Sequence, residues 1–87
     1  MASYELVFRK SVAKDLRRVP NDDVARILKR IRALADDPRP AGCEKLSGLE
    51  RYRIRQGVYR IVYELLDHKL VVLVVKIAHR RDVYRLR

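Results

Sequence analysis

Apolar and polar residues follow two different periods along this chain, and the first segment has the period of a strand. Residues 4–8 alternate between apolar and polar, which is typical of a half-buried strand with one apolar side formed by Tyr4, Leu6 and Phe8. From Ser11, a candidate N-cap, apolar positions recur every three or four residues until Pro20 ends the segment. The pattern predicts a strand followed by a short helix that buries Val12, Leu16 and Val19.

The strongest helical pattern lies after Pro20. Asn21 is placed to cap a second helix, and Asp22 and Asp23 in its first turn interact favourably with the helix dipole. The apolar residues that follow are spaced as a helix requires, at Val24, Ile27, Leu28, Ile31, Leu34 and Ala35. Two prolines, Pro38 and Pro40, end this helix within a stretch, residues 36–42, that is the one candidate linker of the sequence.

Three further runs, after a predicted turn at residues 45–48, have the character of strands. Residues 51–56 alternate, which places Tyr52 and Ile54 on one face and three arginines on the other. Gly57 separates them from residues 58–66, and a tight turn at Asp67 and His68 leads to residues 69–77, which are apolar enough to lie centrally in a sheet. The predicted fold is α+β with the order β-α-α-β-β-β, two N-terminal helices packed on one face of a largely antiparallel four-stranded sheet.

Length and charge restrict what such a fold can do. The chain has 87 residues, enough for one compact domain spanning residues 1–87, and a net charge of +10 that favours nucleic acid or an acidic protein as partner. The single Cys43 cannot form an internal disulfide, and the two histidines give no zinc signature, so we expect no metal or other cofactor. Without a signal-peptide pattern or an apolar run of membrane-spanning length, a cytoplasmic protein without membrane contact is expected.

Four arginines are the strongest candidates for chemistry. Pleating and pairing of adjacent strands could bring Arg53, Arg55, Arg60 and Arg80 together on the sheet face opposite the helices. Guanidinium groups stay charged and offer a planar fork of donors, which suits a scissile phosphodiester and the added charge of its transition state. From the residues alone, a solvated face that keeps the protein soluble is the more common explanation of such a pattern.

The remaining candidates each have a structural alternative. Tyr84 could stack on a nucleobase or pack over an arginine stem. His79 could act as acid or base near neutral pH, although a lone histidine is more often structural. Glu64 shares a strand face with Arg60, which favours an ion pair over catalysis, and we assign no function to His68 or Cys43.

Several motifs in combination resemble the RelE branch of the RelE/ParE toxin superfamily along nearly the whole chain. The matching pieces are YELVF, AKDLRRVP, KLSG, YRIRQGVYRIVYEL and VVKIAHRRDVY. The resemblance implies the toxin of a toxin–antitoxin pair, a ribosome-dependent endoribonuclease that inhibits translation by cutting mRNA without a metal. The resemblance further implies that the 2′-hydroxyl of the message attacks its own phosphate and leaves a 2′,3′-cyclic phosphate and a 5′-hydroxyl.

The same resemblance assigns roles to individual residues. Arg60 is similar to the arginine that stabilises the transition state, Arg80 to the one that assists the leaving group, and Tyr84 to the tyrosine that orients a base. Relatives carry two lysines, one a proposed general base, where this chain has Arg53 and Arg55, and arginine is a poor proton acceptor. The base is then His79, ribosomal RNA, or absent in any efficient form. The three residues after Tyr84 are too few for the C-terminal helix of some relatives.

Two other functions remain open at this stage. The ParE branch shares the fold and inhibits DNA gyrase without cutting RNA, and a passive RNA-binding module would bind without arresting growth. Arg60, Arg80 and Tyr84 together favour the nuclease. The resemblance also implies a cognate antitoxin in a heteromeric complex, and the net charge suggests an acidic segment that folds as it wraps the toxin.

Overall fold

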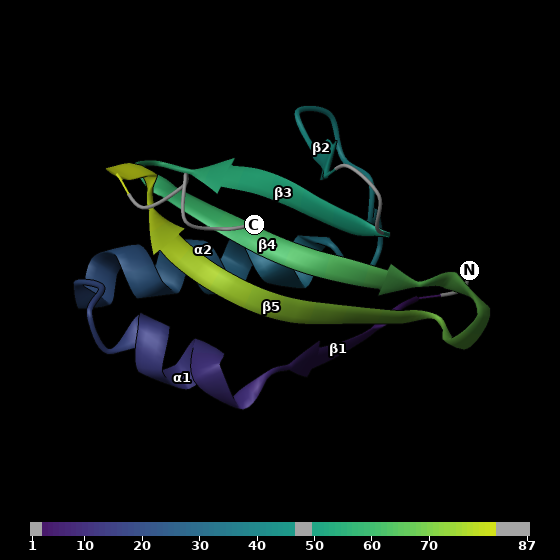
Figure 1. The fold of residues 1–87 in the computed structure, drawn as a ribbon, viewed down its shortest axis with the longest axis horizontal. Coiled ribbons are helices and arrows are strands. Elements are labelled where there is room, and N and C mark those ends of the chain that lie inside the picture. The colour runs from purple at the N-terminus through teal and green to yellow at the C-terminus, as the bar shows by residue number, and fades with distance from the viewer. Residues whose placement is uncertain (1–2, 47–49, 82–87) are drawn as a thin grey trace.

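The computed structural model describes residues 3–46 and 50–81 and has two helices and five strands in that part of the chain (Figure 1). The elements are β1 (Glu5–Phe8), α1 (Lys10–Leu16), α2 (Asn21–Ala33), β2 (Glu44–Leu46), β3 (Arg51–Gln56), β4 (Tyr59–Leu66), the single 3₁₀ turn η1 (Asp67–Lys69) and β5 (Val71–His79). The predicted α+β class and element order are confirmed, and the structure adds one short strand, β2. Its residues Lys45 and Leu46 belong to the segment predicted as a turn.

All five strands form one sheet in the order β1-β5-β4-β3-β2. β1 runs parallel to β5, whereas the other three pairings are antiparallel. β5 therefore lies inside the sheet, as its apolar sequence predicts. A bulge interrupts the pairing of β4 with β5, since Val62 lies opposite Lys76 but Tyr63 lies opposite Val74, which leaves Val75 as the extra residue.

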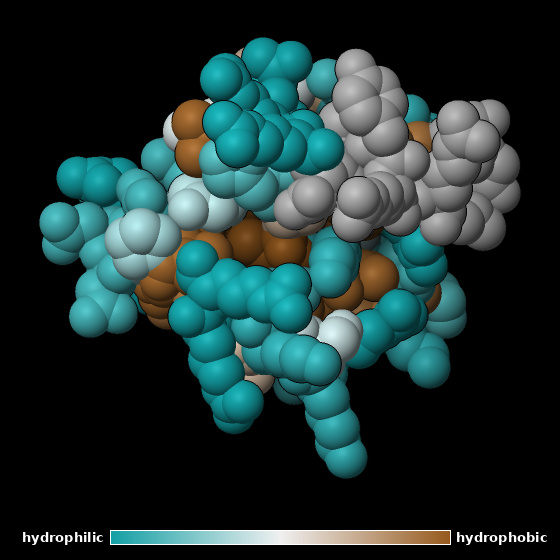
Figure 2. All heavy atoms as spheres, turned by 60° about the vertical axis from the view of Figure 1, so that its left-hand side comes forward, coloured by the Kyte–Doolittle hydropathy of each residue, from teal (hydrophilic) through white to brown (hydrophobic). Residues whose placement is uncertain are grey.

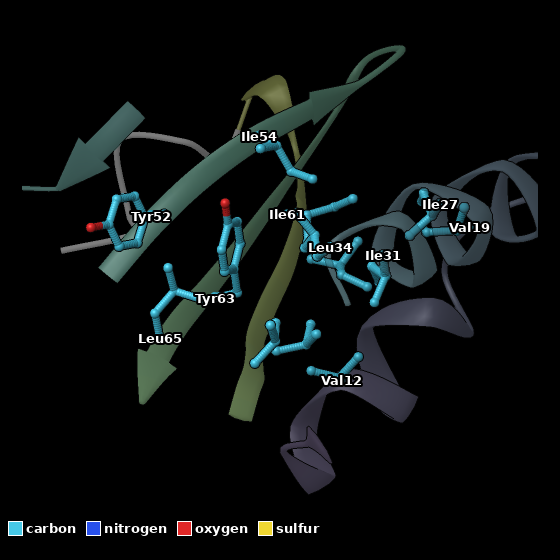
Figure 3. Close-up of a cluster of buried hydrophobic side chains, with 13 residues drawn as sticks. Val12, Val19, Ile27, Ile31, Leu34, Tyr52, Ile54, Ile61, Tyr63 and Leu65 are labelled. Carbon is cyan, nitrogen blue, oxygen red and sulfur yellow. The ribbon is translucent and has the colours of Figure 1, made fainter. Parts of the chain in front are cut away.

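The hydrophobic core lies between the helices and one face of the sheet (Figure 3). α2 contributes Ile27 and Ile31, both fully buried, and α1 contributes Val12. The facing strand residues include Tyr52, Ile54, Ile61, Tyr63, Leu65, Val72, Val74 and Ile77. Each aliphatic side chain buried there stabilises the fold by roughly 1.5–3 kcal/mol. The helical spacing of α2 and the alternation of β3 thus identify these core positions.

Three local predictions differ from the structure. The N-cap of α1 is Arg9 and that of α2 is Pro20, so Ser11 and Asn21 both lie inside their helices and neither acts as a side-chain cap. Extended φ and ψ angles at Arg9 and Pro20 start these helices without a capping side chain. Phe8, predicted on the apolar side, is 43% exposed at the end of the edge strand β1.

The carboxylate of Asp15 binds the backbone of β5 where β1 no longer pairs with it. β1 pairs only with Val71 to Val74, and beyond this point the Ile77 N–H donates to Oδ2 of Asp15 in α1 at 3.1 Å. Oδ1 of Asp15 accepts a bond from Lys76 Nζ at 2.9 Å. Asp15 therefore supplies the acceptor that another strand would otherwise offer to this edge.

At the other end of β5, hydrogen bonds of Asp67 stabilise the turn between β4 and β5. Asp67 accepts hydrogen bonds from the Tyr4 hydroxyl at 2.6 Å and from Arg39 Nη2 at 2.7 Å. The pKa of Asp67 is lowered, chiefly because Arg39 donates to the carboxylate and then because Tyr4 does. Leu70 leaves the turn with a left-handed φ of 53°. Within the described residues, no helix is long and apolar enough to cross a membrane.

Candidate phosphate-binding arginine face

The face of the sheet opposite the helices carries the arginines singled out by their alternation. In β3, Tyr52 and Ile54 are buried in the core, so Arg51, Arg53 and Arg55 are directed to the other side. Arg55 lies directly opposite Arg60 in the antiparallel pairing of β3 with β4. We call Arg53, Arg55, Arg60 and Arg80 the arginine face.

Arg80 reaches this group from the end of β5. Its backbone N–H donates to the Val58 carbonyl at 2.7 Å, which ties the residue to the turn between β3 and β4. The charge of Arg80 contributes to lowering the pKa of Arg60. The charges of Arg53, Arg55 and Arg80, which come from two further strands or their ends, therefore all act on Arg60.

The floor beneath these guanidinium groups is apolar. Val62 and Ala78 are only 3% and 7% exposed, although they lie outside the helix-side core. In the sheet register Val62 is opposite Arg53, and Ala78 is opposite Arg60. The pKa of Arg60 is lowered first by burial and then by the positive charges of Arg55, Arg53 and Arg80. A positive group that water solvates poorly gains more from an incoming anion than a fully hydrated one does.

Carboxylates neutralise only part of this face. Glu44 in β2 accepts a bond from Arg53 Nη2 at 2.8 Å, whereas no carboxylate in the described parts of the chain pairs with Arg55, Arg60 or Arg80. The molecular surface at the end where the β3–β4 turn and the C-terminal end of β5 meet is mostly hydrophilic, with hydrophobic surface recessed between the side chains (Figure 2). Three of the arginines can therefore receive an external anion.

Glu64 has a different partner from the one its position along β4 suggested. It shares the face of Arg60, but it accepts hydrogen bonds from Nε and Nη2 of Arg51, at 3.1 and 2.5 Å. Arg51 is directly opposite Glu64 in the register, whereas four residues along one strand separate Glu64 from Arg60 by about 13 Å. The cross-strand neighbour therefore forms the ion pair.

His79 does not join the arginine face. It lies opposite Tyr59, a residue that packs against the helix-side core, and the two rings meet edge to face with centroids 5.6 Å apart. Its Nδ1 accepts a hydrogen bond from the Arg81 backbone N–H at 3.2 Å. The structure thus supports the structural interpretation of this histidine, while Tyr84 lies outside the described residues.

Glu44 is the residue at this face that sequence reasoning missed. Its place opposite Arg53 depends on β2, a strand of three residues that overlaps the segment predicted as a turn, residues 45–48. The hydrogen bond with Arg53, followed by its charge, lowers the pKa of Glu44, and the charges of Arg55 and Arg60 lower it further. An isolated acidic residue beside the KLSG segment was the only signal in the sequence. In the described residues, no cluster of His, Cys, Asp and Glu could hold a metal ion.

Comparison with known proteins gives a consistent group of relatives. The profile of a family described as the ParE toxin of the type II toxin–antitoxin system parDE matches residues 6–84. Toxin RelG of Mycobacterium tuberculosis is 27% identical over 86 residues, which cover 94% of this chain and 97% of that protein.

Solved structures agree with the sequence matches. A double arginine-to-alanine mutant of Escherichia coli toxin RelE, in complex with a RelB antitoxin peptide, is 32% identical with a TM-score of 0.75 and covers 98% of this chain and 93% of that chain. The archaeal RelE–RelB complex of Pyrococcus horikoshii is 26% identical with a TM-score of 0.78 and covers 90% and 96%. The fold and the sequence therefore lead to the same relatives.

Proposed function

The chain belongs to the RelE/ParE toxin superfamily, in its RelE branch, and we propose that it is an endoribonuclease that cuts mRNA on the ribosome. The observation that carries this proposal is the arginine face, in which Arg55, Arg60 and Arg80 lie over an apolar floor without a carboxylate partner among the described residues. A toxin of a toxin–antitoxin system needs a target, and this surface suits the phosphodiester backbone of RNA.

The chemistry follows from where charge develops. When the 2′-hydroxyl of the message attacks the adjacent phosphorus, the pentacoordinate transition state gains negative charge on its oxygens. Arg60, whose pKa is lowered first by burial, stabilises that charge, and Arg80 assists the departing 5′-oxygen. Arg53 and Arg55 hold the flanking phosphates, and Tyr84 orients a base by stacking. The products are a 2′,3′-cyclic phosphate and a 5′-hydroxyl, and the ribosome supplies much of the substrate geometry.

The decisive experiment is primer extension on a message incubated with the toxin, with and without translating ribosomes. We expect cleavage only of the translated message. Arg60→Ala should reduce it by roughly 10²–10³-fold, the usual loss for one transition-state donor. Arg32→Ala in α2 removes the same charge from an exposed position elsewhere and should change cleavage less than about threefold. Equal cleavage of naked RNA would refute the ribosome requirement, and equal loss in both variants would refute the arginine face as the site.

A cognate acidic antitoxin is the proposed partner. The net charge of +10 favours an acidic chain, and the solved RelE relatives include complexes with RelB. An antitoxin that folds onto this surface should bind less tightly as salt rises. Titration by calorimetry at about 50 and 500 mM salt measures this, and an affinity independent of salt would argue against an electrostatic partner.

One observation favours a second candidate function. The matching family profile carries the ParE description, although the named relatives are RelE proteins. The alternative is a non-enzymatic inhibitor of DNA gyrase, and it predicts inhibition of supercoiling by purified toxin. It also predicts that Arg60→Ala leaves that inhibition intact. Absence of any effect on supercoiling, together with cleaved message, decides for the nuclease.

A further inference from the structure

Glu44 is the carboxylate that the structure brings to the arginine face. Its Oε2 accepts the bond from Arg53 Nη2 at 2.8 Å, and the charges of Arg55 and Arg60 act on it as well. On its own strand, the neighbouring Lys45 pairs instead with Glu50, at 3.2 Å. These are the charged groups of β2, β3 and β4 that bear on this carboxylate among the described residues.

Cleavage by the 2′-hydroxyl needs a proton acceptor, and the other candidates at this face do not provide one. Arginine stays protonated far above neutral pH, so Arg53 and Arg55 cannot take a proton. His79 is directed to the helix side, where its ring packs against Tyr59. Glu64 shares this face, but its partner is Arg51, which lies outside the arginine face and holds the carboxylate through two donors.

We propose that Glu44 is the general base of this toxin, held in place by Arg53 beside the phosphate that the arginine face binds. The inference rests on the proposed ribonuclease function and adds to it a residue with a defined role. A ribonucleotide strand whose phosphate lies on Arg60 would extend its adjacent ribose toward β3 and the edge strand β2. Glu44 is the carboxylate that lines that side of the face.

The geometry of Arg53 makes this arrangement workable. A guanidinium group has five N–H donors, so Arg53 can hold the carboxylate through Nη2 and keep other donors for a phosphate oxygen. A carboxylate and a phosphate bound to one planar fork are neighbours. Oε1 of Glu44 makes no hydrogen bond to any side chain in the described part of the structure, so it can accept the proton of a 2′-hydroxyl.

The step balances without a further reactant. The 2′-oxygen forms its bond to phosphorus as its proton passes to Glu44, and the bond from phosphorus to the 5′-oxygen breaks. The departing 5′-oxygen takes a proton from water, which yields the 5′-hydroxyl and the 2′,3′-cyclic phosphate. Glu44 then returns its proton to solvent, and the site is restored.

The surrounding charges also suit the protonation state that a base needs. Arg53 lowers the pKa of Glu44, so the free toxin holds the residue as a carboxylate at neutral pH. A bound phosphodiester offsets part of the arginine charge, which raises the pKa of Glu44 back toward its ordinary value. The carboxylate therefore becomes a stronger proton acceptor when the substrate is in place.

The first test is single-turnover cleavage on an excess of programmed ribosomes with Glu44→Gln and, as a matched control, Glu50→Gln. The glutamine at position 44 keeps an oxygen acceptor for Arg53 but cannot take a proton. We expect Glu44→Gln to lower the cleavage rate by about 10²–10⁴-fold, the usual contribution of a general base, with unchanged ribosome affinity. Glu50→Gln should remain within about twofold of wild type, because Glu50 pairs with Lys45 outside the arginine face.

The second test changes the titration of the base. Glu44→His should recover part of the rate lost in the glutamine variant, and its rate should rise with pH through a pKa of about 6.5 or below, while wild type stays flat between about pH 5.5 and 7.5. A structural role for Glu44 would not produce that profile.

A wild-type toxin that cleaves while Glu44→Gln cleaves equally well overturns the inference and leaves the proposed function standing. A glutamine variant that loses only ribosome affinity, with its cleavage step unchanged, overturns it as well. A wild-type toxin that leaves translated message intact refutes the proposed function itself, and the assignment of Glu44 falls with it.

Discussion

Asp15 links α1 to the open edge of β5, and replacing it by alanine should destabilise the fold more than the loss of an exposed carboxylate would. The carboxylate accepts the Ile77 N–H and the Lys76 ammonium, and the Asp15 side chain is only 11% exposed. Alanine removes both acceptors and leaves a backbone N–H of an inner strand without a partner in the described structure. Asparagine keeps an oxygen for the Ile77 N–H and loses only the charge.

The magnitudes follow from these contacts. A hydrogen bond to a charged acceptor contributes about 1.5–3 kcal/mol. The ion pair with Lys76, whose side chain is 42% exposed, adds roughly 0.2–1 kcal/mol after solvent screening. Asp15→Ala should therefore lower the free energy of unfolding by about 2–3 kcal/mol. In a domain of this size the loss corresponds to a fall in Tm of roughly 10–20 °C. Asp15→Asn should lower it by about 1 kcal/mol.

Urea denaturation followed by far-UV circular dichroism measures these differences, in an Arg60→Ala background so that cells tolerate expression. A double-mutant cycle with Lys76→Met isolates the ion pair, which should account for less than about 1 kcal/mol. If the alanine and asparagine variants agree within about 0.5 kcal/mol, the Ile77 N–H does not need its acceptor, and the reasoning about the strand edge is refuted.

Three further predictions follow from other contacts. Tyr63→Phe removes the hydroxyl that donates to the Pro38 carbonyl at 2.7 Å and should lower the free energy of unfolding by about 1–2 kcal/mol, so an unchanged urea midpoint would contradict it. Because the pKa of Asp67 is lowered, its ion pair with Arg39 stabilises the fold fully above pH 3.8, and this stabilisation is lost as pH falls through the folded pKa. Asp67→Asn should therefore flatten the acid side of a plot of Tm against pH. An unaltered acid side would show that this ion pair does not cause the acid destabilisation. Arg55→Gln should reduce the slope of log affinity against log salt for single-stranded RNA by about 0.7, one phosphate contact, and an identical slope would place Arg55 outside the interface.

Much of the fold could be predicted from the sequence because periodicity reports burial. The spacing of Ile27 and Ile31 and the alternation of Tyr52 and Ile54 both follow directly from which faces contact the core. β2 could not be predicted in the same way, because a strand of three residues is too short to show a period. Helix starts were also missed, since backbone geometry at Pro20 replaces a capping side chain.

The candidate site was predictable only where it follows strand alternation. Arg53 and Arg55 are placed on one face by the period of β3, and Arg60 is opposite Arg55 because the hairpin turn sets the register. His79 was a reasonable candidate by residue type, but its side of the sheet depends on the bulge between β4 and β5, which no local pattern reveals. The position of Glu44 beside Arg53 depends on the pairing of β2 with β3, which the pattern of either segment alone does not reveal.

The parallel pairing of β1 with β5 also determines when this protein can finish folding. Glu5 is aligned with Val71 and Phe8 with Val74, so among the described strands the first to be synthesised pairs only with the last. Such distant contacts form late, after the entropy of closing a long loop has been overcome. The ribosome that makes this chain must therefore release residues 71–74 before β1 can pair with β5, so the sheet closes only after most of these 87 residues have been synthesised.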